Sequence, residues 1–480
     1  MRKLLLTGLL LAVTASVAAI VVFRPGKAAR VATGLVSHTL CSETFVAGLD
    51  PAQTFAETLQ SMPGIRSITP VLRYRVDRAH KEVTATLAGT FESRAVYREG
   101  IGCGLVYPAG ASALAATAAA IGGGEHRPSN APDIAGPTVV EPTDARLRAA
   151  LDHAFAEPDG GPPRGTKAVI VLHDNRIVAE RYAPGYGIDT PLLGWSMTKS
   201  VMNALVGILV RQGRLSVTAP APVAAWRDPA DPRHPITIEQ LMRMTSGLSL
   251  DETNSGFDPS SRMVYTAPDM AGFAAAAALK AVPGTRYHYS SPSTILLSRI
   301  VRDAAGGRAE DVLRFAEREL FGPLGMRHVT LELDATGTPI GSTYMYASAR
   351  DWARFGMLYA NDGVAAGRRI LPEGWVAYSA TPTAGSQDGY GAGFFTNRGA
   401  SDFGQRRVRG GMPADSFFAS GTQGQRIVIA PAERLVVVRL GRSQDWATFD
   451  IRGLIRLVAD ANAAVTPVDP VAVRPFPIAR

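Results

Sequence analysis

Two pairs of apolar segments, far apart along the sequence, constrain the fold of this chain more than any other feature. Residues 167–173 and 176–182 are predicted strands separated by a polar turn, so they can pair as a β-hairpin. Residues 425–430 and 435–440, separated by a Pro-Ala-Glu turn, give a second predicted hairpin. The segment 197–330 between them is mostly helical by its pattern of apolar residues. We therefore predict an α/β chain of the α+β type, in which one antiparallel sheet of chain-distant strands is flanked by helices and joined to a mostly helical subdomain.

The first 30 residues contain a candidate membrane segment. An uncharged, mostly apolar run extends from Leu4 to Phe23, directly after the cationic pair Arg2-Lys3. Its length is close to the ~20 residues that a helix needs to cross a bilayer. We predict that residues 1–30 form an N-in signal anchor with a transmembrane helix, and that the bulk of the chain is exported to the periplasm or another extracytoplasmic space. Small residues at 15–19 leave a cleaved signal peptide, and therefore a secreted chain, as the alternative.

The chain has two cysteines, Cys41 and Cys103, and both lie beyond the predicted anchor. In an exported chain a disulfide between them is the expected use of both thiols. Two separate buried thiols would be the better interpretation if the chain were cytosolic. Two cysteines are also too few for a Cys-rich zinc site.

A small N-terminal α+β domain is predicted for residues 31–118. Within it, residues 71–76 and 83–89 have the character of two strands joined by a polar turn. A glycine- and proline-containing segment follows and is typical of a flexible linker. The remaining predicted boundaries are a linker at 119–140, a large domain at 141–465 and an irregular tail at 466–480.

The charge of the chain does not indicate a nucleic-acid partner. Its 50 Lys and Arg residues exceed its 42 Asp and Glu residues and give a net charge of +8, but the basic residues form no block. The eight histidines are scattered without a His-Glu-x-x-His motif, so no metal or other cofactor is expected. The sequence leaves the oligomeric state open.

Ser196 and Lys199 lie where a loop enters a predicted helix that runs to about residue 211. Residues three apart on a helix project from the same face. The positive end of the helix dipole and burial both disfavour an ammonium, so Lys199 could be partly neutral and accept a proton from Ser196. The backbone N–H groups there favour the oxyanion that forms once Ser196 attacks a carbonyl. A serine at this position is also a common helix cap, and the pair alone does not establish catalysis.

Two later segments carry groups that would complete such a site. Tyr287 and Tyr289 precede a predicted helix at 294–301, and a tyrosine beside a lysine cation can have its pKa lowered enough to relay protons. A packing role is the usual one for such tyrosines in isolation. Ser420, Gly421 and Thr422 precede the second predicted hairpin. The glycine lets the backbone approach a substrate closely, and the N–H of Thr422 could be a second oxyanion donor.

Taken together, these three motifs resemble the serine β-lactamase and penicillin-recognising hydrolase superfamily, and within it the class C-like branch that includes esterases and 6-aminohexanoate-dimer hydrolases. The resemblance covers about residues 140–460 and includes the segments 236–248 and 349–356. It implies a β-lactamase/transpeptidase-like fold. It also implies that Ser196 is the acylated nucleophile, that Lys199 activates it, that Tyr289 completes the proton relay, and that the amides of Ser196 and Thr422 form the oxyanion hole.

The sequence departs from the family pattern in two motifs that recognise substrate. The Tyr-x-Asn motif reads Tyr289-Ser290-Ser291, so Ser291 stands where an amide contacts β-lactam side chains. The Lys-Thr-Gly motif reads Ala419-Ser420-Gly421, which removes the cation that pairs with a β-lactam carboxylate. These departures favour an esterase or amidase over a dedicated resistance enzyme.

Tyr390 and Asp415 are two further candidates for the substrate pocket. Asp415 precedes the third motif, and Tyr390 lies in a glycine-rich loop. A solvated turn is an equally good interpretation of Asp415, and a loop anchor is the commoner role of an aromatic such as Tyr390.

The sequence therefore predicts a serine hydrolase that acts on a small-molecule ester or amide, with β-lactams among the candidate amides, through an acyl-enzyme on Ser196. Its predicted partners are this substrate and a membrane, and not nucleic acid. The competing hypothesis is a catalytically silent binding or envelope-scaffold protein that keeps the fold. A Ser-His-Asp enzyme is disfavoured because no Gly-x-Ser-x-Gly motif occurs.

Overall fold

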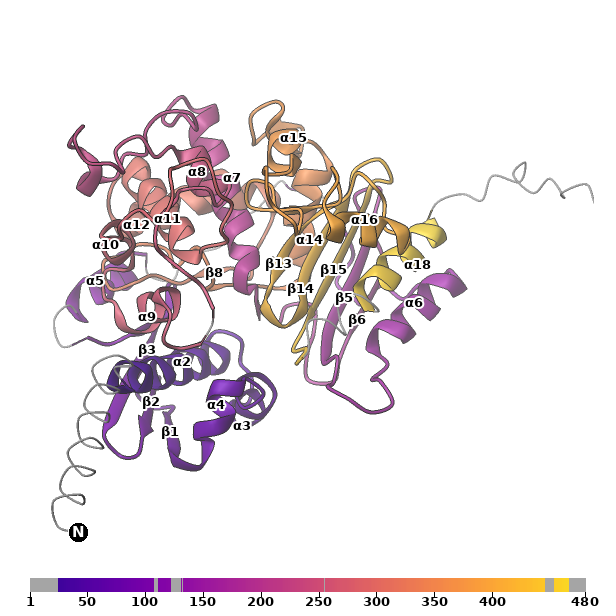
Figure 1. Ribbon diagram of the computed structural model, residues 1–480. Coiled ribbons are helices and arrows are strands. Elements are labelled where there is room, and N and C mark those ends of the chain that lie inside the picture. Colours follow the sequence, from indigo (N-terminus) through magenta and orange to yellow (C-terminus); the bar gives the residue numbers. More distant parts are fainter. Residues whose placement is uncertain are drawn as a thin grey trace, which may run out of the picture.

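The computed structural model (Figure 1) describes residues 25–107, 111–121, 131, 133–253, 255–444 and 453–465. The predicted membrane segment from Leu4 to Phe23 and the tail 466–480 lie outside these described residues. None of the helices described has both the length and the apolar character needed to cross a membrane.

A six-stranded antiparallel sheet is the centre of the larger unit, and it confirms the predicted sheet of chain-distant strands. Its order is β12-β13-β14-β15-β5-β6. The β15–β5 pairing joins the two predicted hairpins, with Val437 opposite Val171. Asp174 and Asn175 both have positive φ, as the tight turn between β5 and β6 requires. The strands are β5 (Thr166–His173), β6 (Arg176–Tyr182), β12 (Phe395–Thr396), β13 (Phe417–Gly421), β14 (Gln425–Ala430) and β15 (Leu435–Gly441).

Helices cover both faces of this sheet, which explains why its central strands are mostly apolar. Alternate side chains of β5 enter two different cores: Val169 and Val171 pack on one face, and Ile170 and Leu172 on the other. In Figure 1 one face is covered by α6 (Ala145–Phe155) and α18 (Ile455–Val465), and the other by α14 (Ala349–Ala360).

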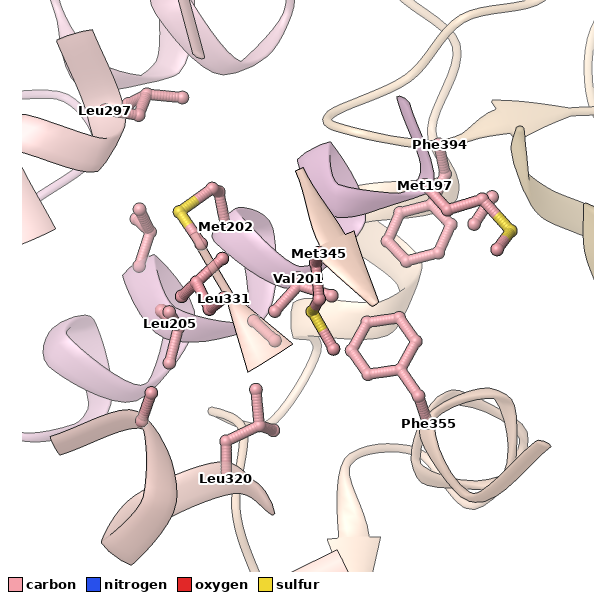
Figure 2. Close-up of a cluster of buried hydrophobic side chains, with 14 of the residues drawn as sticks. Met197, Val201, Met202, Leu205, Leu297, Leu320, Leu331, Met345, Phe355 and Phe394 are labelled. Carbon is pink, nitrogen blue, oxygen red and sulfur yellow. The ribbon is translucent and has the colours of Figure 1, made fainter. Parts of the chain in front are cut away.

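The helical subdomain is built around α7 (Thr198–Arg211), which is buried along most of its length. Leucine, valine and methionine side chains on several sides of α7 contact neighbouring elements, as Figure 2 shows for Val201, Met202 and Leu205. Because α7 is enclosed, its N-terminus is held in a fixed position beside the sheet. The surrounding helices are α8 (Ile238–Met242), α9 (Pro259–Thr266), α10 (Met270–Ala275), α11 (Ser291–Ala305) and α12 (Ala309–Ala316).

Shorter elements complete the larger unit. Strands β7, β9 and β8 form a three-stranded sheet, and β10 and β11 form a two-stranded one. Their bounds are β7 (Leu192–Leu193), β8 (Thr330–Leu331), β9 (Met345–Ala347), β10 (Val364–Ala365) and β11 (Arg368–Arg369), and the short helices are α13 (Gly322–Leu324), α15 (Trp375–Ala380) and α16 (Asp402–Arg409).

The N-terminal unit consists of a four-stranded antiparallel sheet with one long helix, α2 (Pro25–Phe45), packed across it. The disulfide Cys41–Cys103 joins α2 to the last strand, and both side chains are buried. The two strands expected from the sequence are present, with bounds shifted by one or two residues. The strands are β1 (Leu72–Asp77), β2 (Glu82–Leu87), β3 (Phe91–Arg98) and β4 (Gly102–Leu105), and the shorter helices are α3 (Pro51–Thr54) and α4 (Pro63–Ile68).

A buried polar interface connects the N-terminal unit to the larger one. The carboxylate of Glu332 accepts hydrogen bonds from Ser42 Oγ at 2.8 Å and from the backbone N–H of Cys103 at 2.7 Å. Arg442 Nη2 lies 2.6 Å from Glu43 Oε2, and both side chains are almost fully buried. Buried charges of this kind are costly to separate once paired, so the two units are held firmly together.

The segment predicted as a flexible linker is partly built into the fold. Helix α5 (Ala111–Ile121) includes its first residues. The carbonyls of Ile134 and Val140 accept hydrogen bonds from the N–H groups of Ile177 and Glu180 in β6. Ile134 is also buried, so residues 133–140 are ordered by the edge strand of the main sheet, unlike a free linker. Residues 122–130 lie outside the described part.

Removing the disulfide should destabilise the N-terminal unit. The double replacement Cys41→Ser and Cys103→Ser opens a loop with a sequence separation of 62 residues. The chain-entropy model gives a loss of about 4 kcal/mol in the free energy of unfolding. Urea unfolding of the variant and of the oxidised wild type measures the difference. An unchanged midpoint would show that the cross-link contributes nothing to stability.

Candidate active site

Ser196 lies in the 3-10 turn η3 (Trp195–Met197), immediately before α7. Trp195 has φ of 49°, a left-handed conformation that non-glycine residues rarely adopt. Gly194 before it has no room for a side chain, because a Cβ there would lie 2.5 Å from the indole of Trp352. Tight packing thus holds a strained turn that leaves Ser196 half-buried at the start of a rigid helix.

Lys199 follows one helical turn later and makes three hydrogen bonds with its ammonium group. Its Nζ lies 2.9 Å from each of Ser196 Oγ, Ser291 Oγ and the carbonyl oxygen of Ser342. The side chain is only 3% exposed. Burial lowers the pKa of Lys199 to about 8, although the nearby carboxylate of Glu252 opposes the shift. A lysine with this pKa is partly neutral near pH 7 and can accept the proton of Ser196.

Tyr289 completes the group predicted from the sequence. It lies just before α11, its ring centroid is 4.9 Å from Lys199 Nζ, and the Ser196 hydroxyl is near enough to lower the pKa of Tyr289 slightly against its other surroundings. The structure thus brings Ser196, Lys199 and Tyr289 together from two distant parts of the chain.

The expected lowering of the pKa of Tyr289 is wrong. Burial raises this pKa well above its usual value, and the carboxylate of Glu252 raises it further. The sequence suggested only the lysine cation, whereas the fold adds desolvation and a carboxylate, and these outweigh it. Tyr289 is therefore a neutral phenol that can donate and accept a proton in turn, and Lys199 is the group that titrates near neutral pH.

The end of β13 lies directly against the turn that carries Ser196. A Cβ on Gly421 would be 2.2 Å from the carbonyl oxygen of Gly194 and 3.1 Å from Trp195 Cβ, so only glycine fits. Ser420 is half-buried, and Thr422 is exposed directly after the strand. The backbone at Gly421 thus lies against the turn that carries Ser196.

The structure brings Tyr390 to the site but not Asp415. Tyr390 is 1% exposed and packs edge-on against Tyr289, with 5.6 Å between ring centroids, so it helps to hold that ring in place. Asp415 lies at the opposite end of β13 from Gly421, where its carboxylate accepts a hydrogen bond from Ala432 N at 3.1 Å. It precedes the strand by two residues, and the length of the strand separates it from Ser196.

Two groups at the site were not found by sequence reasoning. Glu252 Oε2 accepts a hydrogen bond from Ser291 N at 2.5 Å, and its Oε1 accepts one from Ser291 Oγ at 3.0 Å. Glu252 thereby holds the hydroxyl that contacts Lys199. The carbonyl of Ser342 approaches Lys199 because Gly341 has no side chain, since a Cβ there would lie 2.3 Å from Ser298 Oγ. Only tertiary packing sets these contacts, so no local motif marks them.

The chain is similar to several known proteins. The family model described as Beta-lactamase matches residues 151–461. The 6-aminohexanoate-dimer hydrolase of Paenarthrobacter ureafaciens is 26% identical over 304 residues, which cover 60% of this chain and 76% of that protein.

Solved structures share the fold at lower sequence identity. A putative 6-aminohexanoate-dimer hydrolase from Bacillus anthracis has a TM-score of 0.54 at 19% identity, covering 71% of this chain and 91% of its own. A family VIII carboxylesterase has a TM-score of 0.54 at 17% identity, covering 68% of this chain and 99% of its own. A penicillin-binding protein homolog from Caulobacter crescentus has a TM-score of 0.51 at 21% identity, covering 69% of this chain and 100% of its own.

Proposed function

This chain belongs to the beta-lactamase family and is a serine hydrolase of ester or amide bonds, and we propose that Ser196 carries the acyl group. The observation that supports this most is the contact of Ser196 Oγ with Lys199 Nζ at 2.9 Å, in a site where the pKa of the lysine is about 8. A serine hydroxyl is a weak nucleophile without a base at this distance.

In the proposed acylation step, neutral Lys199 takes the proton of Ser196 while Oγ bonds to the substrate carbonyl carbon. The negative charge on the carbonyl oxygen is stabilised by the backbone N–H groups of Ser196 and Thr422. Tyr289 protonates the leaving alcohol or amine and recovers a proton from Lys199 through the hydrogen-bonded hydroxyl groups. Water then attacks the acyl-enzyme, releases the acid and restores Ser196.

We propose neutral esters and linear amides as the substrates. Ala419 stands where the family carries a cation that pairs with a β-lactam carboxylate, so an anionic antibiotic loses that interaction. The name of the Paenarthrobacter relative describes hydrolysis of a 6-aminohexanoate dimer. We expect short-chain esters and linear amides to be cleaved with a higher kcat/KM than the chromogenic cephalosporin nitrocefin.

Fluorophosphonate labelling tests the proposed nucleophile. The wild type should be labelled on Ser196, and Ser196→Ala should not be labelled. Ser200→Ala is the matched control, because this serine lies on the same helix but donates its hydrogen bond to the carbonyl of Gly393. Undiminished labelling of Ser196→Ala would exclude Ser196 as the nucleophile, and an unlabelled wild type would favour a catalytically silent binding protein.

We also propose that residues 4–23 anchor the chain in a membrane and that the rest is exported. The Cys41–Cys103 disulfide supports export, because disulfides persist in oxidising compartments. If the segment is an anchor, carbonate-washed membranes should retain the chain with its original N-terminus. Release of a shortened chain would instead indicate a cleaved signal peptide.

Replacing Glu252 with glutamine should shift the pH dependence of hydrolysis toward lower pH. The neutral form of Lys199 is the active base, so kcat/KM should rise with pH in the wild type and level off above about 8. The Glu252 carboxylate raises the pKa of Lys199. Its removal should lower that pKa and move the acidic limb of the kcat/KM profile to lower pH.

The matched control for this pH shift is Asp251→Asn. Asp251 is the neighbouring residue, and it pairs with Lys280 at 2.9 Å and His288 at 3.1 Å, neither of which contacts Lys199. Its variant should keep the wild-type profile. A profile of Glu252→Gln that coincides with the wild type, or moves to higher pH, would contradict the proposed role of Lys199 as the titrating base.

A further inference from the structure

A cavity of about 630 Å³ lies at the junction of the two units, outside the candidate active site. Figure 1 shows the elements that enclose it, with α2 and β3 of the N-terminal unit next to α9 of the larger unit. Helix α10 contributes the remaining wall. The lining residues are Gly26, Lys27 and Arg30 from α2, Phe91 from β3, Arg262 and Thr266 from α9, and Phe273 from α10.

The charged lining of this cavity is entirely basic. Lys27, Arg30 and Arg262 supply three cations, and no carboxylate belongs to the lining. Within the described part of the chain, none of the three forms a salt bridge. Arg30 donates to the backbone oxygen of Glu92, at 3.4 Å. Buried Arg262 Nε has no hydrogen-bond partner among the described residues. Because three cations and no carboxylate line the cavity, it is suited to an anion.

Aromatic rings give the cavity an apolar side as well. Arg262 lies over the ring of Phe273, 5.7 Å from its centroid, and this fixes the guanidinium beside an apolar surface. Gly26 packs against Phe91 at the start of α2, where a Cβ would lie 3.3 Å from the ring. The cavity therefore presents both cations and aromatic carbon to a ligand.

The covalent structure places this cavity close to the proposed membrane segment. Gly26 in the lining is three positions after Phe23, the end of the apolar run. Three residues span at most about 11 Å of extended chain. If residues 4–23 cross a membrane, the three cations therefore lie within reach of the lipid head groups at its outer surface.

We propose that this cavity binds the phosphate head group of an anionic phospholipid. The phosphate oxygens accept hydrogen bonds from Arg262 and Arg30, whose guanidinium groups match phosphate geometry, while Lys27 adds charge. The glycerol and upper acyl carbons contact Phe91 and Phe273. The inference rests on the membrane segment proposed above. It gives the N-terminal unit a role in positioning the hydrolase at the membrane surface.

Lipid binding to the full-length chain in a nonionic detergent tests this proposal. Phosphatidylglycerol, phosphatidylcholine or inorganic phosphate is titrated, and native mass spectrometry measures the fraction of protein that retains each ligand. We expect phosphatidylglycerol to bind in preference to phosphatidylcholine and to inorganic phosphate. Arg262→Gln and Lys27→Gln should each weaken phosphatidylglycerol binding about fivefold. Arg66→Gln is the matched control, because Arg66 is an exposed arginine on α4 that does not line the cavity.

Three results would overturn the proposal: equal binding of the two lipids, unchanged binding in both cavity variants, or inorganic phosphate binding as tightly as phosphatidylglycerol. The last would identify a site for free phosphate. Ester hydrolysis by Arg262→Gln should equal that of the wild type, so a failed lipid site is distinguishable from a failed hydrolase. If carbonate washing releases the chain from membranes but the chain still binds phosphatidylglycerol selectively, the proposed membrane anchor is wrong and the proposed lipid site is retained.

Discussion

Replacing Ser196 with alanine is expected to lower kcat/KM for a chromogenic ester by at least about 10⁴-fold. The variant keeps Lys199 and Tyr289 but has no oxygen that can form the acyl-enzyme. The change removes one atom from a half-buried side chain, so the fold should persist. Steady-state kinetics measure the effect, and circular dichroism and the unfolding midpoint check the fold.

The control for the serine replacement is Ser200→Ala, which should retain most of the wild-type kcat/KM. Substantial turnover by Ser196→Ala, with background from other hydrolases excluded by repeated purification, would contradict a mechanism through Ser196. A loss of the same size in Ser200→Ala would indicate general disruption of the start of α7.

Replacing Lys199 with methionine should lower kcat by about 10²–10⁴-fold, the range expected when a general base is removed. Methionine fills similar space but cannot accept the proton of Ser196 or donate to Ser291 Oγ and the Ser342 carbonyl. Because Lys199 carries its charge in a desolvated position, the variant should unfold at a similar or higher urea concentration.

The loss of activity in this lysine variant would then be chemical and not structural. Lys280→Met serves as the control, since Lys280 is partly exposed and pairs with Asp251. If the Lys199→Met enzyme retains the wild-type kcat, Lys199 is not the general base. If the loss of kcat is explained by unfolding, it gives no support for that role either.

The parts of the fold that could be predicted from sequence are those in which one physical signal covers a whole element. β5 and β14 are buried on both faces, so their apolar runs coincide with the strands. β7 and β8 have two residues each and carry no periodicity to detect. Residues 133–140 lack a strand pattern because they are held from outside, by hydrogen bonds to β6.

The site follows the same division between local and distant contacts. Ser196 and Lys199 are neighbours because one helical turn separates them, so their spacing alone predicts the contact. Tyr289 was placed through a resemblance to known enzymes. Glu252 and the Ser342 carbonyl reach the site only through loop packing, and the raised pKa of Tyr289 depends on burial that the sequence does not encode locally. Asp415 lies away from the site, as its interpretation as a turn residue predicts, because the length of β13 separates it from Gly421.

A crystal structure of the fluorophosphonate adduct tests the central claim most directly. We predict a covalent bond from Ser196 Oγ to phosphorus, with the phosphoryl oxygen accepting hydrogen bonds from Ser196 N and Thr422 N, and with Lys199 Nζ and the Tyr289 hydroxyl on either side of the bonded oxygen. Phosphorus bonded to another residue, or a phosphoryl oxygen directed away from both N–H groups, would contradict this account.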